Sequence, residues 1–543
     1  MQELSQIVLE LLRNKGITGE EDIAEYISPA PKRTYSPFLM LNMQEGVNLV
    51  LKCISDGGRI CIYGDYDADG ITSVSIMMQT LSLLTDNIFY YIPSRFDEGY
   101  GLNMDAVKAI RDKGTDLIIT VDCGCVSVDE VSYAKELGMD ILVTDHHNMD
   151  EKAADCLIIN PKQKNCSYPF KGLAGCGVAF KLCCAIQQTA GLDKQIVRDI
   201  LDLVAIGTVG DIVPLVDENR TLVKYGLKAL RTSRRKGLVK LFEGLGIDQK
   251  NADEGNIAYI IVPHLNAAGR MENASLGARL LLEGGEGLAD RLIQINRDRK
   301  KAQNDTYDKC IDEAKSQSEK RNSIIIRCDD AHEGITGIVA GKLKEKYHKP
   351  VVIVTPVEGG FKGTGRSIAG VDLYSLLKDS SEYFTKFGGH KMACGFTIRE
   401  EFYDRFFEEV EERLSLKVSE DPAIMDDESE VDMILSASDI DMKLMEDLEL
   451  LAPFGHDNDK PLFKLNGMKI TEKYYMGSEG SHVRFSACDA SGKYIKCVMF
   501  GRAAEFEYEL NCGRKLCLMG NLEISRWKSR ANPQMVITDI IVE

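Results

Sequence analysis

Residues 59–70 read RICIYGDYDADG, and this stretch decides the fold that the sequence predicts. An apolar run of strand-forming residues leads directly into three aspartates, Asp65, Asp67 and Asp69. Similar short runs follow, separated by stretches with helical spacing: NIFYYI (87–92), DLIITV (116–121), DILVT (140–144) and CLIIN (156–160). Strands that alternate with helices indicate a parallel sheet with crossover connections. Ligands of such sheets bind outside the carboxyl ends of the strands.

Acids and histidines follow the later runs at the same edge of the predicted sheet. Asp122 follows the third run, and Asp145, His146 and His147 follow the fourth. Another acid, Asp211, comes directly after a helical run at 201–210. A single aspartate after a strand is more often a turn former or a helix cap. Their joint occurrence instead indicates a metal site.

The three aspartates of the first run are expected to converge on one point. Residues i, i+2 and i+4 of an extended chain share a face, which is the spacing of Asp65, Asp67 and Asp69. Clustered carboxylates are unfavourable unless a cation neutralises them. The stretch also matches the opening of an EF-hand loop, but Ile76 stands where that loop needs a glutamate, and a strand precedes it.

Carboxylate and imidazole donors in this number can hold two ions. The mixture favours Mn²⁺, and Mg²⁺ is less suited because it prefers oxygen ligands. A pair of divalent ions indicates metal-assisted phosphoester hydrolysis. Cys123 and Cys125 flank this position as candidate zinc ligands, although a free cysteine usually behaves as a small buried hydrophobe.

The rest of the chain predicts further domains. Helical spacing dominates 176–320, β-rich segments return at 322–327 and 350–355, and alternating strands fill 460–543, as in a small β-barrel. Residues 419–450 hold twelve acids against one base, Lys443, and read as a linker with a short helix.

Composition agrees with a globular protein of several domains. The chain has 543 residues, 28% of them charged, and its formal charge of −18 falls to −7 when the acidic segment 419–450 is set aside. We expect no membrane span, because no apolar run approaches the required length. The polar N-terminus and the scattered cysteines favour the cytoplasm, with most thiols reduced.

At this point the sequence resembles the DHH phosphoesterase family. DYDADG (65–70), Asp122, DHH (145–147) and VGD (209–211) look like its successive motifs. Further segments narrow the resemblance to its bacterial single-strand-specific 5′→3′ exonucleases: RFDEGYGL (95–102), NAAGRM (266–271), HEGITGIVAGKL (332–343), GTGRS (363–367), FGGHKMACGFTI (387–398) and LAPFGHDNDKPLF (451–463).

The resemblance implies a role for each matching residue. It makes five residues metal ligands, with Asp122 bridging the two ions: Asp67, Asp69, Asp122, His146 and Asp211. His147 would face the substrate phosphate, and Asp65 would act as a ligand or support the ligands. Substrate contacts are expected from Arg95, Arg270, Arg366, Ser367, Gly389, His390 and, as the best stacking candidate of the barrel, Trp527.

It also implies an α/β architecture in which a parallel-sheet DHH catalytic domain is joined by a long helix to a smaller α/β DHHA1-type domain, followed by a C-terminal OB-type β-barrel. The expected divisions are an N-terminal helical segment (1–50), the catalytic domain (51–284), the connecting helix (285–321), the second domain (322–418), the acidic linker and short helix (419–450) and the barrel (451–543).

The implied activity is hydrolysis of single-stranded DNA to nucleoside 5′-monophosphates with two Mn²⁺ ions, in DNA repair and recombination. The implied partners of this monomer are a single-stranded-DNA-binding protein and a helicase. Two alternatives stay open. One is a DHH phosphodiesterase for short oligonucleotides or cyclic dinucleotides, although such chains are much shorter. The other is a non-catalytic replication scaffold, which would have lost the ligands that this sequence retains.

Overall fold

The computed structural model describes residues 4–95, 98–99, 101–149, 153–426, 431–477, 480–527 and 530–543. Its first sheet is parallel, with the strand order β2-β1-β3-β4-β5. These strands are the predicted ones, at β1 (Ile60–Gly64), β2 (Ile88–Tyr91), β3 (Leu117–Val121), β4 (Asp140–Thr144) and β5 (Leu157–Ile159). The parallel register brings the carboxyl ends of β1, β3 and β4 to one edge.

Helices cover both faces of this sheet, which explains why its strands are continuously apolar. Ile60 and Ile62 of β1 face one core, and Cys61 and Tyr63 face the other, as the two-residue period of a strand requires. The first core is shared with α3 (Met43–Ser55), α4 (Ala68–Leu81) and α7 (Gly175–Ala190). The second is closed by α5 (Met104–Asp112) and α6 (Val128–Glu136).

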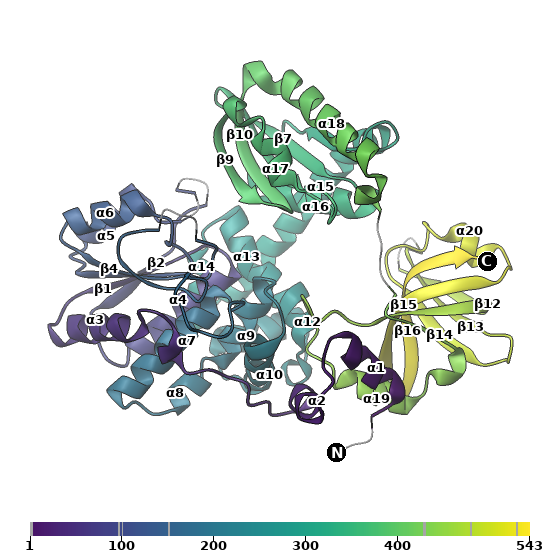
Figure 1. Ribbon diagram of the computed structural model, residues 1–543, viewed down its shortest axis with the longest axis horizontal. Coiled ribbons are helices and arrows are strands. Elements are labelled where there is room, and N and C mark those ends of the chain that lie inside the picture. The colour runs from purple at the N-terminus through teal and green to yellow at the C-terminus, as the bar shows by residue number, and fades with distance from the viewer. Residues whose placement is uncertain are drawn as a thin grey trace.

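A helical region extends the first core and leads out of it. It comprises α8 (Gln195–Arg198), α9 (Leu201–Gly210), α10 (Asp217–Thr232), α11 (Lys236–Leu245), α12 (Glu254–Asn256), α13 (Val262–Met271) and α14 (Ser275–Leu282). The long helix α15 (Leu288–Ser318) then runs to the second sheet, and Figure 1 shows it crossing between the two bodies.

The second sheet is mixed, with the order β6-β7-β8-β10-β9. Its strands are β6 (Ile324–Arg327), β7 (Val351–Val357), β8 (Gly360–Arg366), β9 (Phe384–His390) and β10 (Ala393–Arg399). One face packs on α15 and α16 (Glu333–Tyr347). The other packs on α17 (Leu373–Lys378) and α18 (Tyr403–Glu420).

The third sheet closes into a barrel, because β12 pairs with β15 as well as with β13. Its elements are β11 (Met433–Leu435), α19 (Met442–Glu449), β12 (Leu462–Met476), β13 (His482–Cys488), β14 (Tyr494–Met499), α20 (Glu507–Asn511), β15 (Leu516–Trp527) and β16 (Arg530–Val542). The predicted fold class, a parallel-sheet α/β body joined by a long helix to a smaller α/β body and followed by a barrel, is confirmed.

Two segments to which the sequence analysis assigned no packing partner lie against the barrel core. The acidic segment contributes β11, which pairs with β12, and α19, whose Leu444 and Leu448 lie in the barrel core. The N-terminal helix α1 (Gln6–Asn14) packs on the same core, followed by α2 (Glu20–Ile27). In Figure 1 the purple α1 lies beside α19 at the barrel. In the segment 419–450, the abundance of acids concealed the apolar face of α19.

Within the described residues, no helix combines the length and the apolar character that crossing a lipid bilayer requires. The sixteen cysteines are free thiols.

Candidate metal centre

The DYDADG segment bends from strand to helix just after β1. Asp65 follows the strand, Asp67 caps the N-terminus of α4, and Asp69 lies in the first turn. Asp67 Oδ1 accepts hydrogen bonds from the backbone N–H groups of Asp69 (3.0 Å) and Gly70 (3.1 Å). The carboxylates therefore gather around a helix N-terminus, and the expectation that they share one face of an extended strand was wrong.

Asp122 follows β3 in a left-handed backbone conformation, with φ of 62°. Aspartate tolerates this region better than most residues. A neighbouring glycine makes room for its carboxylate, because a Cβ on Gly175 would lie 2.4 Å from Asp122 Oδ1. Asp122 is buried at the centre of the aspartate cluster.

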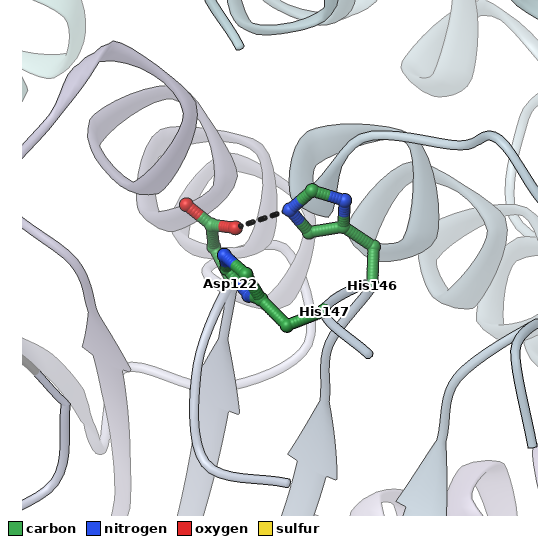
Figure 2. Close-up of side chains that lie close together, drawn as sticks. All are labelled: Asp122, His146 and His147. Atoms are coloured by element: carbon green, nitrogen blue, oxygen red, sulfur yellow. Dashed lines mark ion pairs between the residues drawn. The ribbon is translucent and has the colours of Figure 1, made fainter. Parts of the chain in front are cut away.

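His146 follows β4 and points at three carboxylates from three other elements. Its Nε2 lies 3.1 Å from Asp122 Oδ1, 3.5 Å from Asp211 Oδ2 and 3.9 Å from Asp69 Oδ2. Figure 2 shows the imidazole turned toward Asp122, with His147 beside them. Asp211 reaches this point because it directly follows α9, which packs on α4. The structure thus brings three of the predicted metal-binding carboxylates around His146, while Asp67 lies with Asp65 beside Asp122.

The N-terminus of α7 holds Asp69 in place. Asp69 Oδ2 accepts a hydrogen bond from Gly175 N (2.7 Å), and Oδ1 accepts one from Cys176 N (2.9 Å). Backbone N–H groups at a helix N-terminus favour a negative charge. Sequence reasoning missed this support, because nothing near residue 175 marks it as a partner of residue 69.

The buried carboxylates of this cluster are unfavourable in their charged form unless a cation neutralises them. Burial, followed by the charges of neighbouring aspartates, raises the pKa of Asp65 and Asp122 well above their usual range and raises the pKa of Asp211 to about 8. Burial lowers the pKa of His146 to about 4, so the imidazole is neutral and can act as a metal ligand.

Several donor atoms of this cluster are available to a metal ion, because they make no hydrogen bond within the described protein. In the described part of the chain, four buried atoms of this cluster have no hydrogen-bond partner: Asp65 Oδ1, Asp122 Oδ1, and both ring nitrogens of His146. Buried polar atoms are normally paired. Among the described residues, three overlapping groups of donors are each compact enough for one ion: Asp65, Asp67 and Asp122; Asp69, His146 and Asp211; and Asp122, His146 and His147. Asp122 Oδ1 is in contact with the second group through His146.

His147 has a different environment from its neighbour. Its Nδ1 lies 2.7 Å from Asp145 Oδ1, and Asp145 also accepts backbone hydrogen bonds from His146, His147 and Cys125. Burial alone would lower the pKa of His147, but the hydrogen bond and charge of Asp145 raise it to about 9. His147 is therefore a cation at neutral pH, oriented by Asp145, to which the sequence analysis gave no role of its own.

Three predicted arginines meet near this centre. Burial, together with the charges of Arg95, Arg299 and Arg366, lowers the pKa of Arg270 to about 10. Arg95 also lies over the ring of Tyr66, with 5.3 Å from its Cζ to the ring centroid. Like charges held this close are suited to an anionic ligand. Arg299, on α15, is a member of the group that the sequence reading missed.

The remaining candidates for substrate contact lie in the second domain, except for Trp527, which lies in the barrel. Ser367 is buried, its hydroxyl donates to Val371 O (2.7 Å) and its N–H donates to Met392 O (2.9 Å), so both groups have partners within the protein, and a contact of Ser367 with substrate stays a prediction. Gly389 and the exposed His390 lie at the end of β9, at the same end of the sheet as Arg366. The side chain of Trp527 lies outside the described residues.

Comparisons with known proteins agree with this arrangement. Three family models match in order: DHH family, N-terminal domain (59–208), DHHA1 domain (321–416) and RecJ OB domain (431–539). The single-stranded-DNA-specific exonuclease RecJ of Bacillus subtilis is 35% identical over 99% of this chain and 68% of its own length. RecJ of Salmonella typhimurium is 30% identical over 99% of this chain and 96% of its own.

The chain belongs to the RecJ family.

A solved RecJ structure has the same fold. The crystal structure of RecJ in complex with Mn²⁺ from Thermus thermophilus matches with a TM-score of 0.84 and 26% identity, over 99% of this chain and 76% of that one. The family therefore includes a member that holds the metal ion for which the donor set of this chain is suited.

Proposed function

We propose that this chain hydrolyses single-stranded DNA stepwise from the 5′ end and releases nucleoside 5′-monophosphates, as a RecJ-type exonuclease in DNA repair and recombination. The observation that carries the proposal is the buried group of carboxylates around His146, in which Asp65 Oδ1 and His146 Nδ1 have no hydrogen-bond partner among the described residues. The RecJ relatives are named as single-stranded-DNA-specific exonucleases, which supports the substrate class.

Each residue of the centre has a role in this proposal. Asp67, Asp69, Asp122, His146 and Asp211 would hold two Mn²⁺ ions, or two Mg²⁺ ions, with Asp122 shared and Asp65 supporting them. When bound, such ions activate water and stabilise the charge that develops on the phosphate. The bend after β1 and the N-terminus of α7 keep these ligands in place before substrate arrives.

His147 would contact the substrate phosphate directly. With Nδ1 directed at Asp145, the protonated imidazole would stabilise negative charge on the phosphoryl oxygens. The guanidinium groups of Arg95, Arg270 and Arg366 would bind the terminal 5′ phosphate, and His390 would contact the nucleotide from the second domain. Recognition of an end rather than an interior site gives an exonuclease its direction.

The domain roles follow the divisions expected from the sequence. We assign metal chemistry to residues 51–284, 5′-end binding to 322–418 and strand holding to 451–543, where aromatic side chains such as Tyr474 and Tyr494 are exposed. We further propose that the protein acts as a monomer in the cytoplasm, together with a single-stranded-DNA-binding protein and a helicase.

The test is a Mn²⁺-dependent digestion of single-stranded DNA labelled at the 5′ or the 3′ end. Labelled mononucleotide should appear at once from the 5′ label and late from the 3′ label, and duplex DNA should persist. Early release of the 3′ label, or a strong preference for a dinucleotide over a long strand, would contradict the proposal. Complete inactivity with Mn²⁺ would favour a scaffold.

A further inference from the structure

Arg220, on α10, lies where three parts of the chain meet. The residue is 4% exposed, and its Cζ lies 3.9 Å from the ring centroid of Tyr26, at the end of α2. Its guanidinium donates hydrogen bonds to four backbone carbonyl oxygens, those of Tyr26 (3.2 Å), Leu450 (3.4 Å), Ala452 (2.9 Å) and Pro453 (3.2 Å). The side chain thus joins the catalytic body to the N-terminal segment and to residues 450–461, which we call the connector.

This contact needs an arginine. The planar guanidinium presents several donors in fixed directions, whereas a lysine ammonium offers three donors at one point. A buried carbonyl left without a donor is costly, and the carbonyls of Leu450 and Ala452 would lose the Arg220 donor, whereas Tyr26 O also accepts from Lys224 Nζ and Pro453 O from Asn458 Nδ2. Arg220 therefore contributes a central part of the contacts that hold the connector.

Further hydrogen bonds make the connector a defined structure. Asn458 Nδ2 donates to Leu451 O (3.1 Å) and Pro453 O (2.7 Å), and Tyr26 Oη donates to Asn458 Oδ1 (2.6 Å). Phe454 N donates to Glu254 Oε1 on α12 (2.9 Å). The barrel that follows is consequently attached to the catalytic body through ordered contacts.

The connector also touches the loop that carries a metal-binding candidate. Leu215, four residues after Asp211, donates its N–H to His456 O (2.8 Å). Asn219, adjacent to Arg220, donates to Pro214 O (3.0 Å) in the same loop. One end of α10 therefore holds both the Asp211 loop and the segment that leads into the barrel.

We propose that Arg220 is a positioning residue that fixes the barrel at one distance and orientation from the metal centre. A strand bound on the barrel then presents its 5′ end to the centre at a high effective concentration. This inference rests on the proposed exonuclease function, and it concerns strands long enough to touch both bodies. A short oligonucleotide that occupies the metal centre alone gains nothing from it.

The experiment compares Arg220→Lys and Arg220→Met with the unaltered chain, using a long single strand and a 5′-phosphorylated trinucleotide with Mn²⁺. The KM for the long strand should rise about tenfold, because a mobile barrel lowers the effective concentration. The kcat/KM for the trinucleotide should stay the same. Small-angle X-ray scattering should show a broader distribution of interdomain distances. Arg234→Met changes an exposed arginine of the same body and should leave all values unchanged.

The outcomes separate this inference from the function on which it rests. An unaltered chain that degrades no single strand overturns both. If the unaltered chain is active but the variants match it on long strands, or lose both substrates equally, the positioning role is overturned alone. Should Arg220→Met fail to fold, Arg220→Lys decides, since it keeps the charge and loses the fork.

Discussion

Among single residues, Asp122 is a candidate metal ligand whose backbone lies in the left-handed region that non-glycine residues seldom adopt. Its carboxylate belongs to the Asp65–Asp67–Asp122 donor group and contacts His146, and its backbone is left-handed. Asparagine tolerates the same backbone and is nearly isosteric, so Asp122→Asn should fold normally. It should lower kcat by about 10²- to 10³-fold, because one metal-binding oxygen charge is lost.

The same substitution should stabilise the metal-free protein. Removing one of several crowded carboxylates relieves repulsion, and stability is commonly sacrificed at functional sites. Thermal unfolding with a chelator should therefore give a higher Tm for Asp122→Asn than for the unaltered chain. A lower Tm would show that Asp122 serves the fold rather than a metal.

The protonation of His147 should make kcat depend on pH. Its pKa of about 9 depends on Asp145, so the imidazole loses its positive charge only as the pH rises through that value. In Asp145→Asn the pKa should fall, and the alkaline decline of kcat should move to lower pH. The measurement is a pH–rate profile of both proteins. An unchanged profile would mean that His147 does not act as a cation.

A second pH effect concerns stability without metal. The pKa of Asp211 rises from 3.8 to about 8 on folding, because of burial and the nearby charges of Asp69 and Asp67. Between these values the folded chain binds more protons than the unfolded chain, so the free energy of unfolding falls as the pH rises. Mn²⁺ opposes the same charges, and its effect on Tm should grow across that window. Asp211→Asn should flatten this trend, and a pH-independent effect of Mn²⁺ would contradict it.

At the scale of elements, the N-terminus of α7 is the least obvious part of the centre. Gly175→Ala would place a methyl group 2.4 Å from Asp122 Oδ1, in a buried site that has no room to relax. We expect it to weaken Mn²⁺ binding, measured by calorimetry. Gly341→Ala, on α16 with nothing within 4 Å of the new methyl group, is the control and should stabilise its helix by about 1 kcal/mol.

The elements also show what the sequence could and could not predict. The five strands of the first sheet were predictable because buried parallel strands are short continuous apolar runs. The bend at Asp67 was missed, since D-A-D-G reads equally as a strand end and as a helix cap. The orientation of the Ser367 hydroxyl depends on Val371 and a tertiary fold that local composition does not encode.

At the scale of the whole molecule, the N-terminus and the barrel share one core. Val8, Leu11 and Leu12 of α1 are buried against the barrel. Leu11→Ala should destabilise this body by about 2–5 kcal/mol, seen as a lower first unfolding transition. Glu10→Ala, exposed on the same helix, should have little effect. Equal effects would mean that α1 does not stabilise the barrel.

We expect the carboxyl edge of the first sheet to hold two divalent ions. Diffraction from crystals of the Mn²⁺-loaded protein, recorded at the manganese absorption edge, tests it most directly. We predict two anomalous peaks, one among Asp65, Asp67 and Asp122 and one among Asp69, His146 and Asp211, with Asp122 in contact with both. Absence of both peaks from this edge, with manganese bound elsewhere or not at all, would mean that these carboxylates and His146 do not form a metal centre.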